Sequence, residues 1–389
     1  MSKSARTALV EKLTPEERAL LAAATQFRQD RIAPNAAAWE RSRQPPREAI
    51  REAAHLGLTG IEAPRDKGGQ GAGFVAKTLI AEELATSCMA FAFSLINTQN
   101  VAAHLARNGT PAQIERYLAP LLSGESVGGI ALTEPHAGSD FPAITTMARK
   151  VAGGWVLDGE KAWLTNAAVA DVVMVYAKTE QASGTAGIAA FLVDAHAPGF
   201  ERLPPYALMG GHAIGVGGIR LSGYRAGEDA LLYKPGEAFK RALGGINGAR
   251  TYVAAMCCGM VEAALRCALD RATRRHAFGQ RLLDHQGLRW ALAEIATDLE
   301  AARLLAYRAA ELIERGEDAI LAASFAKKFG ARMAQQRLGD CLQAMGAEGL
   351  REEYPIGRHI ACARIAGFVD GSSEIQNERI GALLEKSYL

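Results

Sequence analysis

The chain has 389 residues, which allows two or three domains with a sizeable core at roughly 100–200 residues per domain. Hydrophobic residues make up 49% of the chain and charged residues 22%, which is typical of folded globular proteins and excludes a largely disordered chain. The 44 Lys and Arg residues nearly balance the 42 Asp and Glu residues, and a net charge of +2 argues against a dedicated nucleic-acid-binding protein.

The N-terminal sequence MSKSARTALVEKLTPEER contains no apolar run typical of a secretory signal, and no stretch of the chain approaches about 18 uncharged apolar residues. We therefore expect a cytoplasmic protein with no membrane partner. The six cysteines form no C-x-x-C pair and have no histidine at zinc-ligand spacing, so neither a disulfide framework nor a metal site is expected.

Residues 1–127 are predicted to form an N-terminal α-helical domain. The strongest start signal is Thr14-Pro15-Glu16-Glu17, with a capping Thr, a Pro at the first helical position and a Glu at the third. Further helices are expected at PREAIREAAHLG, FVAKTLIAEELA and AQIERYLAPLL, with the glycine-rich PRDKGGQGAG as a loop between the first two.

Residues 128–236 show the alternation of strands and are predicted to form a middle antiparallel β-domain. GGWVLDGEKAWLT has the pattern of a hairpin that turns at Asp158-Gly159. DVVMVYAKT, GIAAFLVD and GGIRLSGYR are expected to be further strands.

Residues 237–389 return to helical spacing and are predicted to form a C-terminal four-helix bundle. Leu288, Leu292, Ile295 and Leu299 recur on one helical face. The order of helices, strands and helices indicates a multi-domain α+β protein and does not suit a βαβ nucleotide-binding fold.

Gly124-Glu125-Ser126-Val127-Gly128 matches the G-x-S-x-G pattern of serine hydrolases. That pattern requires a strand before the Ser and a helix after it. Here a predicted helix precedes and a predicted strand follows, which argues against a serine hydrolase. The sequence also has no G-x-G-x-x-G after a strand and no Walker A motif.

Four segments carry the functional information: Ala131–Asp140 (ALTEPHAGSD), Lys161–Asn166 (KAWLTN), Arg275–Gly279 (RHAFG) and Asp370–Gln376 (DGSSEIQ). Each alone also fits a turn, a core tryptophan, a solvated charge or a helix cap. Together and in this order they resemble the acyl-CoA dehydrogenase family, over nearly the whole chain from the GGQG loop at 68–71 to the last helix.

The resemblance implies FAD as the cofactor, bound between the β-domain and the C-terminal bundle and completed by a neighbouring subunit, usually in a homotetramer. It assigns FAD contacts to Leu132, Thr133, Gly138, Ser139, Trp163, Thr165, Arg275, Phe278, Gln286, Gln343, Gly346, Ser372, Glu374 and Gln376. Trp163 and Thr165 would cover one face of the isoalloxazine and donate near its N5 atom. Arg275, Phe278 and Gln286 would reach the adenine and pyrophosphate of a partner subunit's FAD, where a guanidinium suits phosphate oxygens.

The resemblance also implies an acyl-CoA substrate and an electron-transfer flavoprotein as electron acceptor. It assigns substrate contacts to Ser139, Asn247, Arg250 and Gly371. Asp370 stands where most of the family has a catalytic Glu, which takes the α-proton of the thioester while the β-hydride leaves for flavin N5. Some relatives carry the base at the position of Ala249 instead, and Ala249 cannot take a proton.

Asp370 is one methylene shorter than Glu, and a misplacement of about 1 Å at a reacting centre can cost on the order of a hundredfold in rate. The other departures are His136 and Ala347, where the family usually has Gly, and Asn247, where it usually has Asp. A helix cap is the alternative interpretation of Asp370. We prefer the base, because burial beside an apolar acyl pocket would raise the pKa of the carboxyl toward neutral pH.

The sequence is also compatible with other functions and substrates. An Asp at this position also occurs, by resemblance, in nitroalkane oxidases, so a flavin oxidase or monooxygenase of the same fold is the main alternative. A carrier-protein thioester could replace the CoA thioester, and the acyl pocket would be lined by residues such as Phe91, Phe93, Leu95 and Val369. Some proteins of this fold bind DNA, but residues 350–389 carry five basic against six acidic residues, which is not a basic tail.

Overall fold

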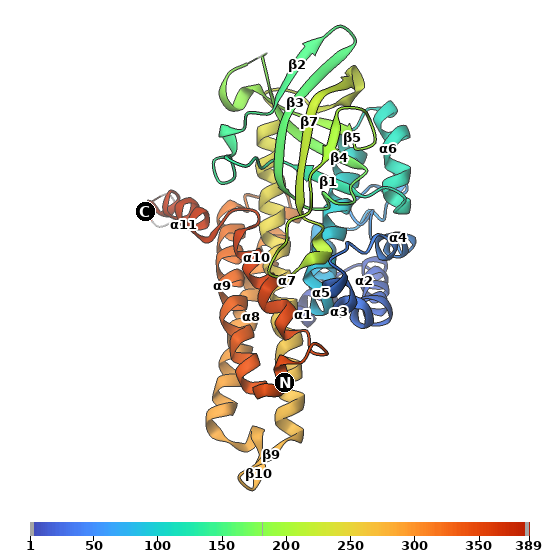
Figure 1. The fold of residues 1–389 in the computed structure, drawn as a ribbon. Coiled ribbons are helices and arrows are strands. Elements are labelled where there is room, and N and C mark those ends of the chain that lie inside the picture. Colours follow the sequence, from blue (N-terminus) through green and yellow to red (C-terminus); the bar gives the residue numbers. More distant parts are fainter. Residues whose placement is uncertain (1–3, 181, 386–388) are drawn as a thin grey trace.

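The computed structural model describes residues 4–180, 182–385 and 389 (Figure 1). The helices of the N-terminal part are α1 (Ala5–Lys12), α2 (Pro15–Phe27), the π-helix Arg28–Ile32, α3 (Ala33–Ser42), α4 (Arg47–His55), α5 (Phe74–Asn108) and α6 (Pro111–Ser123). The strands of the middle part are β1 (Gly128–Ala131), β2 (Met147–Val151), β3 (Gly154–Leu164), β4 (Val172–Thr179), β5 (Ile188–Asp194), β6 (Phe200–Arg202), β7 (Gly217–Gly227) and β8 (Leu231–Tyr233). The C-terminal part contains α7 (Ala238–Arg274), β9 (His276–Ala277), β10 (Gln280–Arg281), α8 (Gln286–Glu314), α9 (Ile320–Met345), α10 (Ile356–Phe368) and α11 (Ser373–Gly381).

The predicted start of α2 is confirmed as a capping box. The Thr14 hydroxyl accepts from the Glu17 N–H at 3.2 Å, and the Glu17 carboxylate accepts from the Thr14 N–H at 2.9 Å. Pro15 occupies the first helical position, where no intrahelical N–H is needed. These contacts are local, which is why the sequence alone predicts them.

α5 is the central helix of the N-terminal part, and nearly all of its residues are buried. Its helical geometry is interrupted at Cys88, which has a φ of −156° and a ψ of 99°. By length and composition α5 and α7 could each cross a membrane, contrary to the expectation from the sequence, but 94% and 72% of their most apolar windows lie inside the protein. Packing in the core therefore accounts for their apolar sequences.

The middle part is an eight-stranded sheet in the order β6-β7-β3-β2-β4-β5-β8, with β1 paired to β4. Most pairs are antiparallel as predicted, but β1 and β2 both run parallel to β4, so the sheet is mixed. Successive residues of β4 face opposite sides. Met174 and Tyr176 pack toward α5 and α6, whereas Val173 and Val175 pack against β3, β5 and β7.

The predicted turn at Asp158-Gly159 is wrong. β3 runs without a break through both residues, and the chain turns instead between β2 and β3 at Ala152-Gly153, where Gly153 has a φ of 77°. Gly159 serves a different purpose, because a Cβ at this position would lie 2.6 Å from the Thr146 hydroxyl oxygen. A close approach within the sheet, and not a turn, requires the glycine.

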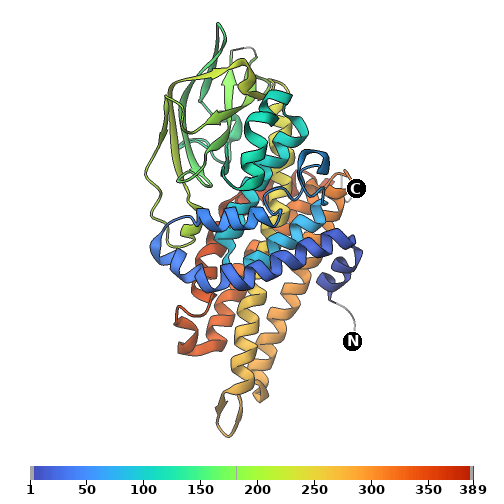
Figure 2. The same ribbon diagram turned by 90° about the vertical axis from the view of Figure 1, so that its right-hand side faces the viewer.

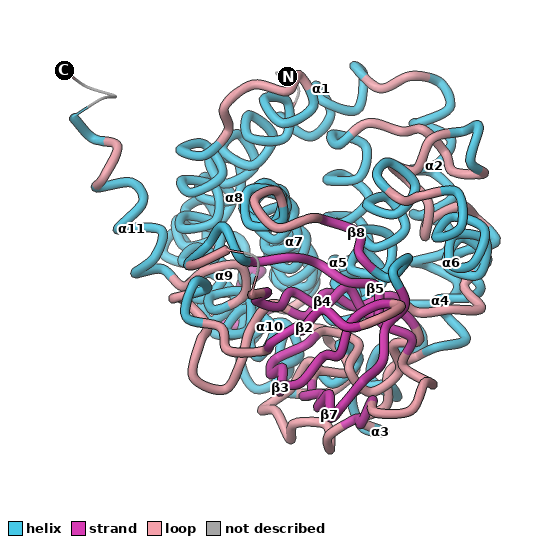
Figure 3. The backbone as a smooth tube through the Cα atoms, turned by 90° about the horizontal axis from the view of Figure 1, so that it is seen from above, coloured by secondary structure: helices cyan, strands magenta, loops and turns pink. Residues whose placement is uncertain are grey.

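α7, α8, α9 and α10 form the predicted C-terminal four-helix bundle, which also packs against α5. The apolar stripe of α8 is confirmed, since Leu292, Ile295 and Leu299 are buried in the core. α7 starts beside the sheet and runs to the opposite end of the bundle, where the β9–β10 hairpin leads into α8 (Figures 1 and 2). α11 projects away from the other helices (Figure 3).

A cluster of buried charges joins α1, α5, α7 and α8. Arg303 donates to Glu82 at 2.8 and 2.7 Å and also pairs with Glu262. Tyr307 donates to the other carboxylate oxygen of Glu82, and Arg6 of α1 lies 3.3 Å from the same residue. Glu82 and Arg303 are buried, so the loss of either removes the main compensating charge from its buried partner.

We expect Arg303→Met to lower the free energy of unfolding by about 3–5 kcal/mol, the usual cost of breaking a buried ion pair from one side. Urea unfolding followed by circular dichroism measures this loss. Arg308→Met, at an exposed position of the same helix, is the matched control and should change stability by no more than about 0.5 kcal/mol. Equal losses in the two variants would show that the buried cluster does not stabilise the fold.

Candidate active site

The LTEPHAGSD and KAWLTN segments lie side by side. The Ala162 N–H donates to the Thr133 carbonyl at 2.9 Å, and the Lys161 ammonium donates to the Leu132 carbonyl at 3.0 Å and to Glu134 at 2.8 Å. Lys161 and Glu134 are both buried. Burial would raise the pKa of Glu134, but the charge of Lys161 and hydrogen bonds from neighbouring residues lower it to about 2. This ion pair therefore fixes the two segments against each other at neutral pH.

Trp163 presents an exposed aromatic surface at the end of β3. Its φ is 56°, its side chain is 61% exposed, and its ring centroid lies 4.7 Å from that of Tyr206. Thr165 is buried, and the hydroxyls of Thr165 and Thr133 make no hydrogen bond to any residue that the structure describes. An exposed indole with unpaired hydroxyls nearby can cover and hydrogen-bond a planar polar ligand.

The rest of the LTEPHAGSD segment is a turn closed by hydrogen bonds between Glu134 and Ala137 at 3.0 and 3.1 Å. Gly138 and Ser139 follow it and are exposed, so their backbone and hydroxyl groups are available to a ligand. His136 is also exposed, and its Nε2 lies 3.6 Å from Glu134. The turn thus accommodates His136 at the surface.

Asp370 follows α10 in the left-handed conformation, with a φ of 57°. The Arg250 Nε–H donates to the Asp370 backbone carbonyl at 2.9 Å, and the Gln376 side chain donates to the Gly371 carbonyl at 3.0 Å. Asn247 accepts from another N–H of Arg250 at 2.9 Å. Of the predicted substrate residues, Arg250 therefore bonds directly to the Asp370 backbone, Gly371 follows Asp370 in the chain, and Asn247 is joined to it through Arg250.

Asp370 is half-buried, and its carboxylate has no hydrogen-bond partner among the described residues. Its Oδ2 atom is inaccessible to solvent and has no partner among the described residues. Burial raises the pKa of Asp370 to about 6, against the opposing charges of Lys327 and Arg250. Asp370 is not the cap of α11, because Ser372 holds the N-cap position and no side chain caps that helix.

The other predicted residues of this segment have separate environments. Ser372 is half-buried, Glu374 is exposed, and Gln376 is buried with its Oε1 atom unpaired. Together with Asp370 Oδ2, this oxygen is an acceptor for which the described chain provides no donor.

The predicted contacts to a partner subunit's FAD lie elsewhere in the chain. The hairpin between α7 and α8 contains Phe278, is preceded by Arg275 and is followed by Gln286, the first residue of α8. It lies at the end of the bundle opposite the β-domain (Figures 1 and 2). Phe278 is 97% exposed with a φ of 51°. Gln343 and Gly346 are exposed at the end of α9. One chain therefore does not bring the hairpin residues together with Trp163.

The four candidates for the acyl pocket divide in two. Phe91 belongs to the helical core, where its ring lies 5.4 Å from that of Trp39, and Leu95 is completely buried. Phe93 lies 6.5 Å from the ring of Tyr252, which is two residues after Arg250 on α7. Phe93 and Val369 are therefore the two that lie near the Asp370 segment.

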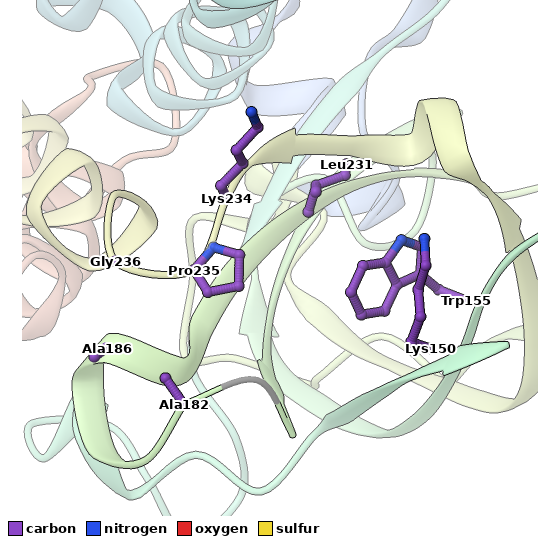
Figure 4. Close-up of a pocket in the computed structure, with 8 residues that line it drawn as sticks. All are labelled: Lys150, Trp155, Ala182, Ala186, Leu231, Lys234, Pro235 and Gly236. Atoms are coloured by element: carbon purple, nitrogen blue, oxygen red, sulfur yellow. The ribbon is translucent and has the colours of Figure 1, made fainter.

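A hollow in the β-domain is unrelated to these residues (Figure 4). Its lining consists of Lys150, Trp155, Ala182, Ala186, Leu231, Lys234, Pro235 and Gly236. The Lys150 ammonium lies 4.6 Å from the ring centroid of Trp155 and pairs with Glu228. None of the predicted site residues lines this hollow, and we do not assign the active site to it.

Comparison with known proteins agrees with this arrangement. The N-terminal, middle and C-terminal domain models of the acyl-CoA dehydrogenases match residues 14–125, 129–223 and 236–384. The mitochondrial short-chain specific acyl-CoA dehydrogenase of Bos taurus is 33% identical over 363 residues, which cover 93% of this chain and 88% of that protein.

Two solved structures have the same fold. Butyryl-CoA dehydrogenase from Megasphaera elsdenii has a TM-score of 0.91 and 32% identity, covering 96% of this chain and 99% of its own. A structure described under the electron transferring flavoprotein of Acidaminococcus fermentans has a TM-score of 0.91 and 31% identity, covering 96% and 98%.

The chain belongs to the acyl-CoA dehydrogenase family. This membership confirms the predicted family, the arrangement of two helical domains around a middle β-domain, and FAD as cofactor. The protein is thus an FAD-dependent oxidoreductase.

Sequence reasoning missed Tyr206, which packs on Trp163, and Lys327, which lies near Asp370. Tyr206 is in a proline-rich loop without a pattern of its own. Lys327 does have a signal, because it stands among the buried positions Ala323, Ala326 and Ala331 of α9, where a lysine is unusual.

We expect Asp370→Asn to be more stable than the wild-type protein at pH 8. The pKa of Asp370 is raised from 3.8 to about 6, so its contribution to stability is present below about pH 4 and is lost as the pH rises through about 6. Asparagine has no charge to bury, and the gain should be about 1–3 kcal/mol at pH 8 and should shrink toward pH 4. Urea unfolding at both pH values measures it, and equal stability of the two proteins at pH 8 would contradict a costly buried carboxylate.

Proposed function

We propose that this protein oxidises the Cα–Cβ bond of an acyl-CoA thioester to give the 2-enoyl thioester, with Asp370 as the base that takes the α-proton. The observation that carries the proposal is the Asp370 carboxyl group, which has a buried unpaired oxygen and a pKa of about 6. A carboxyl with this pKa is largely ionised at neutral pH and still basic enough for efficient proton transfer.

The residues around Trp163 fit FAD. The exposed indole offers a face to the isoalloxazine, and the Thr133 and Thr165 hydroxyls have no competing partner among the described residues. Leu132 and the exposed Gly138 and Ser139 border the same segment. FAD held by these residues would supply the acceptor for the β-hydride of the substrate.

The substrate thioester is proposed to bind beside Arg250. Two nitrogens of its guanidinium bond to Asp370 and Asn247, while Nη2 has no hydrogen bond to a described residue. Nη2 lies beside Gly371, where a Cβ would approach it to 3.3 Å. A glycine at this position therefore avoids crowding Nη2, which we propose to bond a polar group of the substrate, with the Ser139 hydroxyl as a second proposed contact.

We propose that the FAD site is completed by a second copy of the chain, in a homotetramer. The support is the position of β3, whose end carries Trp163, and of the β9–β10 hairpin, which carries Phe278, at opposite ends of the chain's fold (Figure 1). An aromatic side chain that is 97% exposed, as Phe278 is, has a natural role at an interface between subunits.

The proposed electron acceptor is an electron-transfer flavoprotein. The similarity to the structure described under the flavoprotein of Acidaminococcus fermentans supports it. The first alternative is a flavin oxidase or monooxygenase, which would pass electrons to O₂ instead. The second alternative is a dehydrogenase whose substrate is a carrier-protein thioester instead of acyl-CoA.

The test of the overall reaction is anaerobic mixing of the purified FAD-bound protein with a panel of saturated acyl-CoAs and acyl-carrier thioesters. Bleaching of the flavin absorbance identifies the substrate, and slow reoxidation in air supports a dehydrogenase. Reoxidation within milliseconds with release of peroxide or an oxygenated product would establish the oxidase or monooxygenase instead.

We expect Asp370→Asn to retain FAD while the rate of flavin reduction falls by about 10²–10⁴-fold, the usual contribution of a positioned general base. Stopped-flow absorbance measures the rate. Asp370→Glu should also reduce the rate with the native substrate, because the pocket is adapted to the shorter side chain. A wild-type rate in Asp370→Asn would remove Asp370 from the chemistry.

We expect Arg275→Ala to lower the affinity for FAD by removing a charge-assisted contact of about 1.5–3 kcal/mol. Titration of the apoprotein with FAD, together with analytical ultracentrifugation, measures affinity and assembly. Arg274→Ala is the matched control, since Arg274 is an exposed neighbour that pairs within its own helix with Asp270. Equal FAD affinity in the two variants would place Arg275 outside the site.

A further inference from the structure

The end of α10 has an irregular hydrogen-bonding pattern. The Val369 N–H donates to the Ile365 carbonyl at 3.1 Å, so the next backbone bond would run from Asp370 N–H to the Ala366 carbonyl. Asp370 leaves the helix with a φ of 57°, and that bond does not occur in the described chain. The Ala366 carbonyl therefore lacks the backbone donor that a continuing helix would provide.

Lys327 supplies the missing donor from a different helix. Its ammonium group donates to the Ala366 carbonyl, and the side chain is buried where α9 packs against α10. A cation is favourable at a helix C-terminus, because the unpaired carbonyls carry partial negative charge. Lys327 thus holds the last turn of the helix that delivers Asp370.

The charged and titratable groups around Asp370 come from three helices. α7 contributes Arg250 and Tyr252, α9 contributes Lys327, and α11 contributes Arg379, whose charge acts on Arg250. Burial raises the pKa of Tyr252 and keeps it neutral, whereas Arg250 remains protonated with a pKa of about 10. Burial lowers the pKa of Lys327, and the Asp370 charge opposes that shift. The two cations that act directly on the carboxylate are therefore Arg250 and Lys327.

We propose that Lys327 is a positioning residue for Asp370: its ammonium caps α10 so that the chain can turn at Asp370, and its charge stabilises the carboxylate as the ionised base. The inference rests on the proposed function of Asp370. A buried ammonium is costly, and a neutral donor such as a glutamine amide would be enough for a cap alone. The charge of Lys327 acts on the Asp370 carboxylate without a direct ion pair, and this interaction explains why the cap is a charged group.

The first experiment compares Lys327→Met, Lys327→Gln and Lys327→Arg with Lys328→Met as the matched control. Lys328 is the next residue of α9, is half-buried, and makes no hydrogen bond or ion pair with the Asp370 segment among the described residues. The rate of flavin reduction is measured across the pH range for each FAD-bound protein, with the acyl-CoA that reduces the wild type.

The wild-type rate should rise with pH through an inflection near 6 as Asp370 loses its proton. Met and Gln remove the cation and should move this inflection upward by about one pH unit or more, so that the rate at pH 6 falls about five- to tenfold. Arg keeps the charge and should keep the inflection, and Lys328→Met should leave the whole profile unchanged. If both Lys327→Met and Lys327→Gln lower the maximal rate but leave the inflection of the pH–rate profile unchanged, Lys327 has only a structural role and the inference is overturned.

The second experiment needs no turnover. A double-mutant cycle measures at pH 8 how far Lys327→Gln lowers the Tm of the wild-type protein and how far it lowers the Tm of the Asp370→Asn variant. We expect a larger fall in the wild type, where a charged carboxylate loses its partner. Equal falls would overturn the charge interaction even if the variants cannot be assayed. If Asp370→Asn itself reduces flavin at the wild-type rate, the proposed function fails; if only the Lys327 variants behave as wild type, this inference alone fails.

Discussion

One hydrogen bond, from the Arg250 guanidinium to the backbone carbonyl of Asp370 at 2.9 Å, joins the first helix of the C-terminal bundle to the segment after α10. A non-glycine residue in the left-handed conformation costs of order 1–3 kcal/mol and persists only where its surroundings hold it. Here Arg250 holds one carbonyl and Gln376 holds the next. The position of the candidate base therefore depends on contacts made through the main chain.

The same arrangement explains why the Asp370 carboxylate is unpaired although cations lie nearby. Elsewhere the protein pairs its buried carboxylates directly, as Glu134 is paired with Lys161 and Glu82 with Arg303. Around Asp370, the hydrogen bonds of Arg250 and Lys327 go to the carbonyls of Asp370 and Ala366 instead. Their charges limit the rise of the Asp370 pKa, and the carboxylate oxygens stay available to accept a proton.

Local signals in the sequence were sufficient for much of the fold. The capping box at Thr14 and the apolar stripe through Ile295 depend on residues within a few positions of each other, and both were predictable. The parallel pairing of β1 and β2 with β4 joins distant segments, and the sequence contains no local record of it. The prediction of a turn at Asp158-Gly159 was wrong because the chain turns earlier, where Gly153 and Gly154 follow Ala152. Gly159 is needed for another reason, since a side chain at this position would clash with Thr146.

The candidate site residues also divide into those that local motifs indicate and those that depend on tertiary packing. Trp163 and Asp370 could be proposed as site residues because they belong to contiguous motifs, and the family resemblance led in the same way to Arg250. The cap that Lys327 provides could not be found, since it depends on the packing of α9 against the end of α10 and on a backbone that has already left the helix. The separation of the Arg275 hairpin from Trp163 was likewise visible only once the length and direction of α7 were known.

The shorter side chain of Asp370 has a structural consequence for the substrate. Replacing Glu by Asp withdraws the carboxylate by up to one carbon–carbon bond, about 1.5 Å. The backbone cannot make up this distance by shifting toward the ligand, because Arg250, Gln376 and, one helical turn earlier, Lys327 hold its carbonyls. With Asp370 as the proposed base, the α-carbon of the substrate would have to come closer to the main chain at Gly371, which has no side chain of its own. Under the proposed function, a short base beside a glycine would therefore favour acyl groups that can approach the main chain closely.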